Sequence, residues 1–535
     1  MIITELQQLY AAHPNVEGMC RLLKDNSVRH LYCSGLCASA ASLFSSVLVQ
    51  RAECPFVFIL GDLEEAGYFY HDLTQILGAE RVLFFPSSFR RAIKYGQKDA
   101  ANEILRTEVL SRLQKGEEGL CVVTCPDALA EKVVSRKELG DKTLKLHTGE
   151  KVDMDFVTEV LRSYGFEYVD YVYEPGQYAV RGSIIDVFSF SSECPFRIDF
   201  FGDEVESIRT FEVESQLSKE KKEDIVIVPD LSRSLEQGGN GGMVSFLDFL
   251  RPDTLLAMRD FLWLRERIQA VHDESLTAAA IAAREAEENG AISLEGKLID
   301  GGEFTLRALD FRRMEFGTKP TGTPDATVSF STAAQPIFHK NFDLVAESFQ
   351  DYLARNYTLY ICSDSLKQTD RIRAIFEDRG DNISFTPVER TLHEGFADDT
   401  LRLCIFTDHQ LFDRFHKYNL KSDKARSGKV ALSLKELNQF TPGDYVVHTD
   451  HGVGRFTGLV RIPNGDTTQE VMRLVYQNDD VVFVSIHSLH KVSKYKGKEG
   501  EAPRLNKLGT GAWEKLKDRT KTKIKDIARD LIKLY

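Results

Sequence analysis

Short apolar runs separated by helical patterns dominate the first 140 residues. The runs His30–Ser34, Phe56–Leu60, Val82–Phe85 and Leu120–Cys125 have the length and composition of buried strands. Amphipathic stretches such as DAANEILRTEVLSRLQKG lie between them. Because strands that alternate with helices build a parallel sheet, we expect residues 1–143 to form an α/β domain.

The pattern changes at residue 144. Residues 144–230 contain consecutive strand-like segments joined by turn residues, as in GQYAVRGSIIDVFSFSSECPFRIDFFGDEVESIRTFEV. This predicts an inserted antiparallel α+β module. The first domain is expected to resume over 231–325, which is predicted to be largely helical. Strand–helix alternation returns at 326–415 and predicts a second, small α/β domain of unassigned role.

The remaining residues combine a linker, a β pattern and a helical pattern. A lysine-rich linker at 416–437 precedes the compact β pattern of 438–500, which contains GDYVVHTDHGVGRFTGLV and EVMRLVYQNDDVVFVSI. Residues 501–535 predict the start of a connecting helix. Because this pattern reaches Tyr535 without a cap or glycine, we expect the natural protein to continue beyond it. The fold class predicted for the whole chain is multidomain α/β.

The segment LYCSGLCASAASLF has the strand–glycine–helix setting of a phosphate-binding P-loop, G-x-x-x-x-G-K-[ST]. At the motif positions this chain has Gly35, Ala40, Ala41 and Ser42. Ala41 lacks the ammonium group that pairs with phosphates, and Ala40 disfavours a positive φ. An ordinary strand–turn–helix also explains the segment. No Ser/His/Asp, zinc or paired-carboxylate pattern is found, so we predict no catalytic residue and no metal site.

Two segments suggest binding to other proteins. Arg181, Arg197 and Arg209 recur along the predicted hairpins, with Phe201 nearby. Exposed arginine beside aromatic residues is typical of interface anchors, although sheet-edge charge and core packing would produce the same pattern. The run Glu470–Tyr476 is apolar on more than one side, which favours an edge strand that another protein extends.

Charge is unevenly distributed. The chain carries a net charge of −13, whereas its last 45 residues, from Lys491, contain 14 Lys+Arg and 6 Asp+Glu. The acidic remainder disfavours general nucleic-acid binding, and the basic tail either contacts phosphate or is a solvated helix face. No apolar run is long enough to span a membrane, and no secretory signal is evident. Nine scattered cysteines fit a reducing cytoplasm.

Three separated segments resemble one family. YEPGQYAVRGSIIDVFSFSSECPFRIDFFGDEVESIRTFEVESQLS resembles the UvrA-binding domain of the repair protein UvrB, in the version carried by bacterial transcription-repair coupling factors (the Mfd family). TPGDYVVHTDHGVGRFTGL with LVYQNDDVVFVSIHSLHKVSKY resembles that family's RNA-polymerase-interacting domain, a Tudor/SH3-like barrel shared with CarD-type regulators. KLGTGAWEKLKDRTKTKIKDIARDL resembles the helix that joins this barrel to the motor.

The resemblance implies roles for particular residues. The first domain would be a degenerate RecA/P-loop-like domain of the UvrB type, whose former nucleotide site is marked by Gly35, Ala40, Ala41 and Ser42. The implied UvrA contacts are Arg181, Arg197, Phe201 and, more weakly, Arg209. The polymerase β subunit would add a strand to an edge formed by Val471, Met472, Arg473 and Leu474, with Arg461 and Phe483 as neighbours and Met472 as the first choice. Ser485 stands where a proline is usual in the family.

The resemblance also implies that the motor, its ATP and Mg²⁺, and most contact with double-stranded DNA belong beyond Tyr535. This chain would be the recruitment half, which binds stalled RNA polymerase and UvrA, while the full-length protein would be an ATP-dependent DNA translocase. Two alternatives stay open. An active UvrB-like helicase needs the lysine that Ala41 replaces, and a stand-alone CarD-like regulator would bind polymerase without UvrA.

Overall fold

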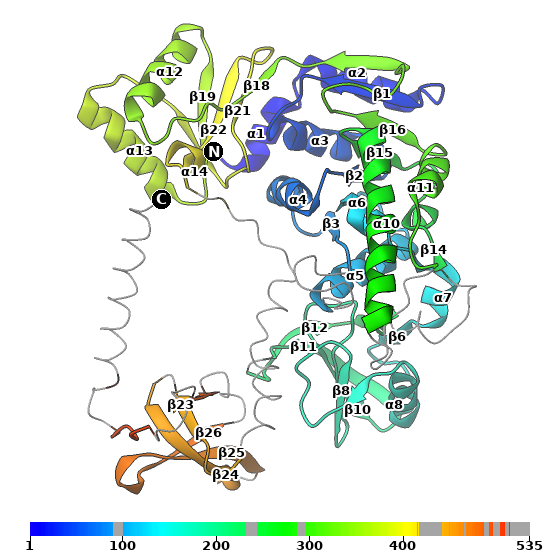
Figure 1. Ribbon diagram of the computed structural model, residues 1–535, viewed down its shortest axis with the longest axis vertical. Helices are drawn as coiled ribbons and strands as arrows, with labels where there is room; N and C mark the ends of the chain where they lie inside the picture. The colour runs from blue at the N-terminus through cyan, green and yellow to red at the C-terminus, as the bar shows by residue number, and fades with distance from the viewer. Residues whose placement is uncertain are drawn as a thin grey trace. The chain divides into compact units, whose positions relative to one another are not determined.

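The computed structural model describes residues 1–88, 100–213, 215–231, 243–285, 296–414, 416, 441–448, 450–464, 467–485, 492–495, 503–508 and 513 (Figure 1). The chain divides into two compact units, residues 1–144 with 227–423 and residues 145–226 with 424–535. The first unit contains a large and a small α/β domain. The second contains the inserted module and the β domain of residues 441–495.

A seven-stranded, wholly parallel sheet forms the centre of the large domain. In spatial order its strands are β17 (Ala326–Ser329), β1 (His30–Ser34), β16 (Arg312–Glu315), β15 (Leu255–Met258), β2 (Phe56–Ile59), β4 (Cys121–Thr124) and β3 (Val82–Phe85). The four strands predicted before residue 140 are confirmed to within one residue at each end, because each is a short apolar run buried on both faces.

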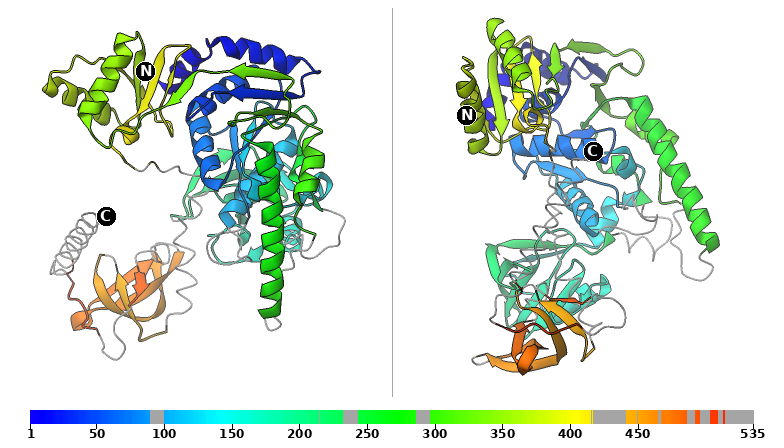
Figure 2. Two further views of the ribbon diagram at one scale, coloured as in Figure 1. Left: turned by 45° about the horizontal axis from the view of Figure 1, so that its top comes forward. Right: turned by 60° about the vertical axis from the view of Figure 1, so that its left-hand side comes forward.

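Helices cover both faces of this sheet. Figures 1 and 2 show α3 and α4 on one side and α10 and α11 on the other. The helices are α1 (Ile3–Tyr10), α2 (Pro14–Lys24), α3 (Ala40–Arg51), α4 (Leu63–Leu77), α5 (Ala100–Lys115), α6 (Pro126–Leu129), α7 (Arg136–Asp141), η1 (Phe246–Phe249), α10 (Phe261–Glu285) and α11 (Gly301–Ala308). Two small sheets pair β5 (Val133–Val134) with β14 (Met243–Val244) and β6 (Leu144–His147) with β13 (Asp224–Ile227).

Local sequence explains where the helices start and stop. Asp62 caps α4 by accepting a hydrogen bond from the backbone N–H of Glu65 at 2.9 Å, and Gly78, with φ of 89°, ends the same helix. Pro14 occupies the first turn of α2, where its missing N–H costs nothing. The Arg312 guanidinium donates to the carbonyls of Leu22 and Leu23 at the end of that helix.

Two expectations for the large domain need correction. The segment 231–325 is not largely helical, because β15 and β16 lie at the centre of the sheet. Each has only four residues and no flanking pattern that sets it apart. The small domain does not begin at Ala326 either, since β17 pairs in parallel with β1 and completes the large sheet.

The small domain has a five-stranded sheet of order β18-β21-β22-β19-β20. Its elements are β18 (Thr332–Ala334), α12 (Phe342–Ala354), β19 (Thr358–Ser363), α13 (Leu366–Arg379), β20 (Thr386–Glu389), β21 (Phe396–Asp398), β22 (Leu403–Thr407) and α14 (Asp408–Leu411). The strands β20, β19 and β22 run parallel, whereas β21 is antiparallel to its neighbours. Phe349, Ile361, Phe376 and Phe406 belong to the separate core of this domain.

The inserted module is the antiparallel α+β structure that the sequence predicts. Its six-stranded sheet has the order β12-β11-β10-β9-β8-β7, and only β7 and β8 pair in parallel. The elements are α8 (Met154–Ser163), β7 (Glu167–Tyr168), β8 (Gln177–Arg181), β9 (Ile184–Val187), β10 (Phe196–Phe201), β11 (Glu204–Phe211) and β12 (Ser218–Lys222). The edge strand β12 reads SKEKK and is fully exposed, a composition that discourages further strand pairing.

The β domain is a five-stranded antiparallel sheet of order β26-β25-β24-β23-β27. Its elements are β23 (Tyr445–His448), β24 (Gly452–Asn464), β25 (Thr467–Val475), η2 (Gln477–Asp479), β26 (Val481–Ser485) and β27 (Val492–Lys494). The linker expected at 416–437 and the connecting helix expected at 501–535 lie almost entirely outside the described residues.

The expectation that Val471–Leu474 forms an edge strand is wrong. These residues belong to β25, which pairs with β24 on one side and with β26 on the other. The segment has apolar residues on both faces because both faces of this strand are buried within the domain, as Val471 and Met472 show. The strands at the two edges of the described sheet are β26 and β27.

Candidate functional site

The strand, glycine loop and helix around Gly35 occur in the order that a P-loop would have, and other parts of the chain pack against them. Gly35 has a φ of 79°, and a Cβ there would lie 2.1 Å from the Phe330 carbonyl oxygen. Close packing against the segment after β17 therefore requires this glycine. Ala40 and Ala41 are buried at the start of α3. Their backbone N–H groups donate to the carbonyls of Cys37 and Ala38 at 3.1 and 3.4 Å, whereas in a P-loop such groups cradle phosphate.

The hydroxyl of Ser42 is engaged by a carboxylate. Its hydroxyl donates to Asp72 Oδ2 at 2.7 Å, and Ser39 Oγ donates to the same oxygen at 2.6 Å. Asp72 lies on α4 and is only 2% exposed. Burial raises the pKa of its carboxyl to about 6, while the serine hydroxyls oppose that shift. A buried acidic group of α4 thus contacts the start of α3, beside Ala41, where a P-loop sequence has a lysine.

A cavity of about 400 Å³ opens beside these residues. The acidic groups that line it are Asp62, Glu64, Glu65, Asp72 and Glu394. Of the described lining residues, Arg259 is the one arginine or lysine, and it forms an ion pair with Glu65. A surface of this charge repels a triphosphate.

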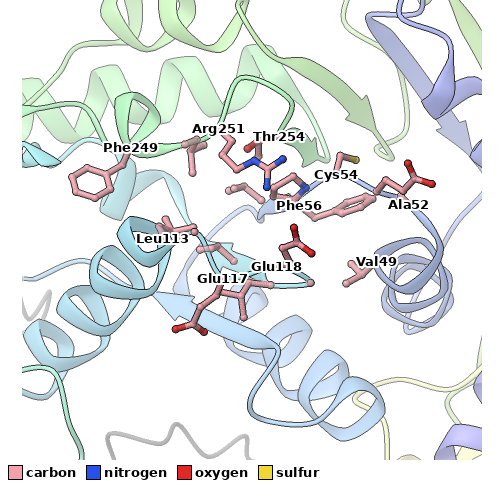
Figure 3. A pocket seen from close by; sticks show the side chains of 18 of the residues that line it. Val49, Ala52, Cys54, Phe56, Leu113, Glu117, Glu118, Phe249, Arg251 and Thr254 are labelled. Atoms are coloured by element: carbon pink, nitrogen blue, oxygen red, sulfur yellow. The ribbon is translucent and has the colours of Figure 1, made fainter. Parts of the chain in front are cut away.

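A second cavity, of about 310 Å³, lies at the amino ends of β2, β4 and β15, the opposite end of the sheet (Figure 3). Figure 3 shows Arg251 and Glu118 directed toward its centre from different loops, above a floor that includes Phe56 and Leu113. Its charged groups have both signs, so the lining favours no ligand class.

The four residues expected to contact UvrA share one face of the module's sheet. Arg197 pairs across the sheet with Asp186 of β9 and with Arg209 of β11. Arg181 is two residues from Ala179, which pairs with Asp186, and Phe201 is four residues from Arg197 along β10. Because side chains alternate between faces with a period of two, this register puts all four on the same side.

Asp186 is the centre of that face. Its side chain is fully buried, and Arg197 forms a two-pronged ion pair with it, Nε to Oδ1 at 2.8 Å and Nη2 to Oδ2 at 2.9 Å. Arg181 also pairs with Asp186 Oδ2. The Arg197 side chain is 17% exposed, and its guanidinium carbon lies 4.6 Å from the centre of the Phe211 ring. Arg197 is therefore mainly a structural residue that neutralises a buried charge.

Phe201 is better placed to meet a partner than Arg209. Arg209 lies half-buried between Arg197 and Lys221 in the cross-strand row, and its Nε is buried with no hydrogen-bond partner among the described residues. The row is thus basic on the side away from Asp186. Phe201 is 79% exposed next to the Gly202–Asp203 turn. An exposed aromatic ring near unneutralised cations is a typical interface arrangement.

The residues expected to contact polymerase divide into buried and exposed groups. Val471, Met472 and Leu474 belong to the core of the β domain, and Met472 is 0% exposed. Arg473 is exposed and lies directly across from Phe483 of the edge strand β26, which is 50% exposed. The backbone of Arg461 lies opposite that of Glu470 in the register of the β24–β25 hairpin. The role of Arg461, Arg473 and Phe483 as polymerase contacts stays a prediction.

Sequence reasoning missed the two carboxylates that organise these sites. Asp72 and Asp186 both appear in the sequence as single acids in apolar surroundings, in YFYHDL and SIIDVF. A charge inside an apolar run is the signal that could have found them, because such a group must be paired or hydrogen-bonded when buried. Their partners come from other elements and leave no local pattern.

Among the described residues, no group of three or more His, Cys, Asp or Glu side chains is arranged to hold a metal ion. Within the same residues, no helix combines the length and apolar character of a membrane-spanning segment.

Comparison with known proteins first defines the classes of two domains. Residues 144–232 match the UvrB interaction domain, and residues 440–496 match the CarD-like/TRCF RID domain. The first match covers the inserted module with its basic face, and the second covers the β domain. One chain therefore carries a UvrB-type interaction domain and a CarD-like domain, with the second part of the large domain and the small α/β domain between them in the sequence.

The particular similarity is to transcription-repair coupling factors. The chain is 24% identical to the transcription-repair-coupling factor of Bacillus subtilis (strain 168) and 25% identical to that of Staphylococcus aureus (strain bovine RF122 / ET3-1). Each alignment covers 94% of this chain and 48% of the relative, so the chain spans about half the length of these relatives. Together with the two domain matches, this supports the resemblance to the N-terminal portion of that family.

Proposed function

We propose that this chain is the recruitment part of a transcription-repair coupling factor. The single observation that carries the proposal is the presence of a UvrB interaction domain and a CarD-like/TRCF RID domain in one chain that is similar to such factors over 94% of its length. The module would bind UvrA, and the β domain would bind stalled RNA polymerase. Nucleotide excision repair would thereby be brought to a blocked transcript.

For the UvrA contact we infer a surface formed by Phe201, Arg209 and the exposed part of Arg181. These side chains share one face of the sheet, and the cations at its Arg209 end are not balanced by a carboxylate across the strands. A partner surface with acidic groups and an apolar hollow complements that arrangement. Arg197, on the same face, would stabilise this surface through its ion pair with the buried Asp186.

For the polymerase contact we infer strand addition at an open edge of the β domain. Since β25 is internal, the polymerase β subunit would pair its strand with β26, where Phe483 and the neighbouring Arg473 are exposed. Backbone pairing along an edge supplies affinity, and side chains that flank the edge supply specificity. We further propose that this domain is a Tudor/SH3-like barrel, as its five antiparallel strands permit.

For the large domain we propose a RecA-like fold of the UvrB type whose nucleotide site has decayed. Its parallel sheet and strand–glycine–helix segment support this, as do the alanines at 40 and 41 and the acidic cavity. ATP, Mg²⁺ and translocation on double-stranded DNA would then belong to a motor in the rest of the full-length protein.

Gel filtration of the chain with purified UvrA and with purified RNA polymerase tests the proposal. We expect co-elution with each partner separately. Binding to polymerase without UvrA would instead support a CarD-like regulator. Micromolar binding of Mg·ATP by the chain, measured by calorimetry, would support an active UvrB-like helicase. Failure to bind either partner would overturn the proposal.

A further inference from the structure

A loop of the small domain occupies the amino end of α3, where a P-loop would hold phosphate. The backbone N–H of Glu394 donates to Ser39 Oγ at 3.0 Å, and the N–H of His393 donates to Asp72 Oδ1 at 2.7 Å. Because Ser39 and Ser42 donate to the other oxygen of the same carboxylate, Asp72 joins α3, α4 and the loop of the small domain through one buried charge.

Residues of the small domain also fix the position of this loop. Gly395 donates its N–H to Gln410 Oε1 at 2.7 Å. A Cβ at this position would lie 2.0 Å from Gln335 Oε1 and 2.7 Å from the Ile405 carbonyl oxygen, so the backbone passes where no side chain fits. The His393 ring stacks on Tyr68 of α4, with ring centres 3.5 Å apart and planes inclined by 10°. The position of the loop is therefore determined by both domains.

Three further contacts join the ends of this segment to the large domain. Asp398, at the end of β21, is fully buried and accepts a hydrogen bond from the Tyr10 hydroxyl at 3.0 Å. The His13 imidazole lies 3.7 Å from the same carboxylate. At the other end of the domain, the Tyr68 hydroxyl donates to the His416 carbonyl at 2.8 Å. Contacts from α1, α2 and α4 thus converge on residues around the loop.

We propose that the small domain is a permanent internal occupant of the former nucleotide site, and that Asp72 is the residue that fastens it there. The loop 393–395 takes the space of a phosphate group and supplies peptide N–H groups, which require an acceptor rather than a cation. On this account a lysine at position 41 is not needed, since the loop supplies N–H donors and not a phosphate. Asp72 is needed because it accepts a hydrogen bond from one of those donors. The small domain would then have a structural role, which is to hold the two α/β domains together. Recruitment of partners does not require this role.

Hydrogen–deuterium exchange of the whole chain, followed by mass spectrometry, tests this role. Asp72→Ala should raise exchange about tenfold in peptides around residues 39–46 and 390–398, because the opening of the joint becomes easier. Exchange in the module, residues 145–226, should not change. Glu64→Ala is the matched control, since this exposed carboxylate lines the same cavity but holds no part of the loop.

Two milder variants guard against a general folding defect. Asp72→Asn keeps the shape but loses the second acceptor oxygen, and Tyr10→Phe removes only the hydroxyl bonded to Asp398. Each should raise exchange around 390–401 more than Glu64→Ala does. If Asp72→Ala, Asp72→Asn and Tyr10→Phe all leave 390–398 as protected as in the control, the proposal is overturned. If exchange rises equally across all strands of the large sheet in the milder variants, Asp72 stabilises the whole domain and the proposal is likewise overturned.

Discussion

At the scale of single residues, Asp186 shows how one buried charge decides what its neighbours do. Arg197 donates two hydrogen bonds to it, while Arg209, directly across from Arg197, has no carboxylate opposite it in the sheet. Two arginines that look equivalent in the sequence therefore have different roles. Arg197 neutralises a buried carboxylate, whereas the contact of Arg209 with a partner stays a proposal.

Arg197→Ala should destabilise the chain's module by about 3 kcal/mol, because it removes the main partner of a buried carboxylate. Arg209→Ala should cost only about 1 kcal/mol, because this half-buried arginine has no carboxylate opposite it in the strand register. Urea unfolding followed by tyrosine fluorescence and by circular dichroism measures both. Equal midpoints for the two variants would contradict the structural role of Arg197.

The proposed loss of the nucleotide site also concerns single residues. We expect no binding of Mg·ATP by this chain, and the double change Ala40→Gly with Ala41→Lys should not create any. Position 41 is buried, so the introduced lysine would lie among Asp72, Ser39 and the loop of the small domain and not beside a phosphate. Isothermal titration calorimetry checks this expectation. Micromolar affinity in the double variant would show that the site is still open.

At the scale of elements, strand order decides which residues of the β domain reach a partner. Met472→Arg places a charge in a 0% exposed position of an internal strand, whereas Phe483→Arg places the same charge on an exposed edge. We expect Met472→Arg to unfold the β domain, since an unpaired buried charge costs several kcal/mol. Phe483→Arg should leave the thermal melt within a few degrees of wild type and weaken polymerase binding.

Thermal melts and polymerase pull-downs of both variants separate these effects. Leu459→Arg, at an exposed position on β24, serves as a control for surface charge. A normal melt for Met472→Arg would mean that β25 is not internal in solution. Normal polymerase binding by Phe483→Arg would move the contact away from β26.

The joint between α4 and the small domain should be sensitive to acid. His71, His393, His409 and His416 lie close together, with ring centres 4.4 to 5.9 Å from that of His416. Burial lowers the pKa of His71 and of His409 to about 4 and that of His393 to about 3, with the neighbouring imidazoles adding to the shift. The charged groups around them are Asp364, Asp408, Arg414 and Asp72.

The sign of the pH effect follows from these directions. The folded histidines stay neutral while those of the unfolded chain take up protons below about pH 6.5, so their contribution to stability is complete above pH 6.5 and is lost toward pH 4. Asp72, with its pKa raised to about 6, acts in the opposite sense between pH 6 and 4. The histidines outnumber it, and we expect the free energy of unfolding to fall between pH 6.5 and pH 4.5.

His409→Gln should reduce this pH dependence, because it removes one titrating group while its amide can still donate to the His393 carbonyl, which His409 Nε2 contacts at 2.8 Å. Urea unfolding at pH 7.5, 6.0 and 4.5 measures the change. His339→Gln, at an exposed position of the same domain, is the control. The same pH dependence in His409→Gln as in wild type would contradict this account.

At the scale of the whole molecule, the two proposed contacts belong to domains with separate cores. Phe211 and Phe188 pack in the module, whereas Met472 and Tyr476 pack in the β domain. Substitutions at distant sites that share no partners act independently. Recruitment should therefore be divisible into two separate binding events.

Phe201→Ala should weaken UvrA binding by about 2 kcal/mol, roughly thirtyfold in Kd, and leave polymerase binding unchanged. Phe156→Ala, which removes another exposed aromatic ring of the same module, is the matched control. Surface plasmon resonance with each partner immobilised measures both affinities. Loss of both partners in Phe201→Ala, or equal loss in the control, would show that Phe201 is not a specific contact.

The sequence by itself determined the local elements and the domain order of this protein. The sequence predicted strands such as Phe56–Ile59 and Val82–Phe85 and the change from an α/β to an antiparallel pattern at residue 144. It also showed alanine at two positions of a P-loop pattern. All of these are local properties of the chain, set by hydrophobic period, turn residues and side-chain type. The two domain matches agree with segments whose motifs are continuous in the chain.

Only the tertiary structure decided which strands are internal, which arginine neutralises the buried Asp186 and which loop packs against the start of α3. Met472 is in the core because side chains from other strands, among them Val446, Phe456 and Val484, pack with it. Arg197 is structural because Asp186 lies across the sheet from it. Asp72 meets His393 over 321 residues of sequence. Such pairings depend on sheet order and domain docking, and their energies come from groups that no local pattern places together.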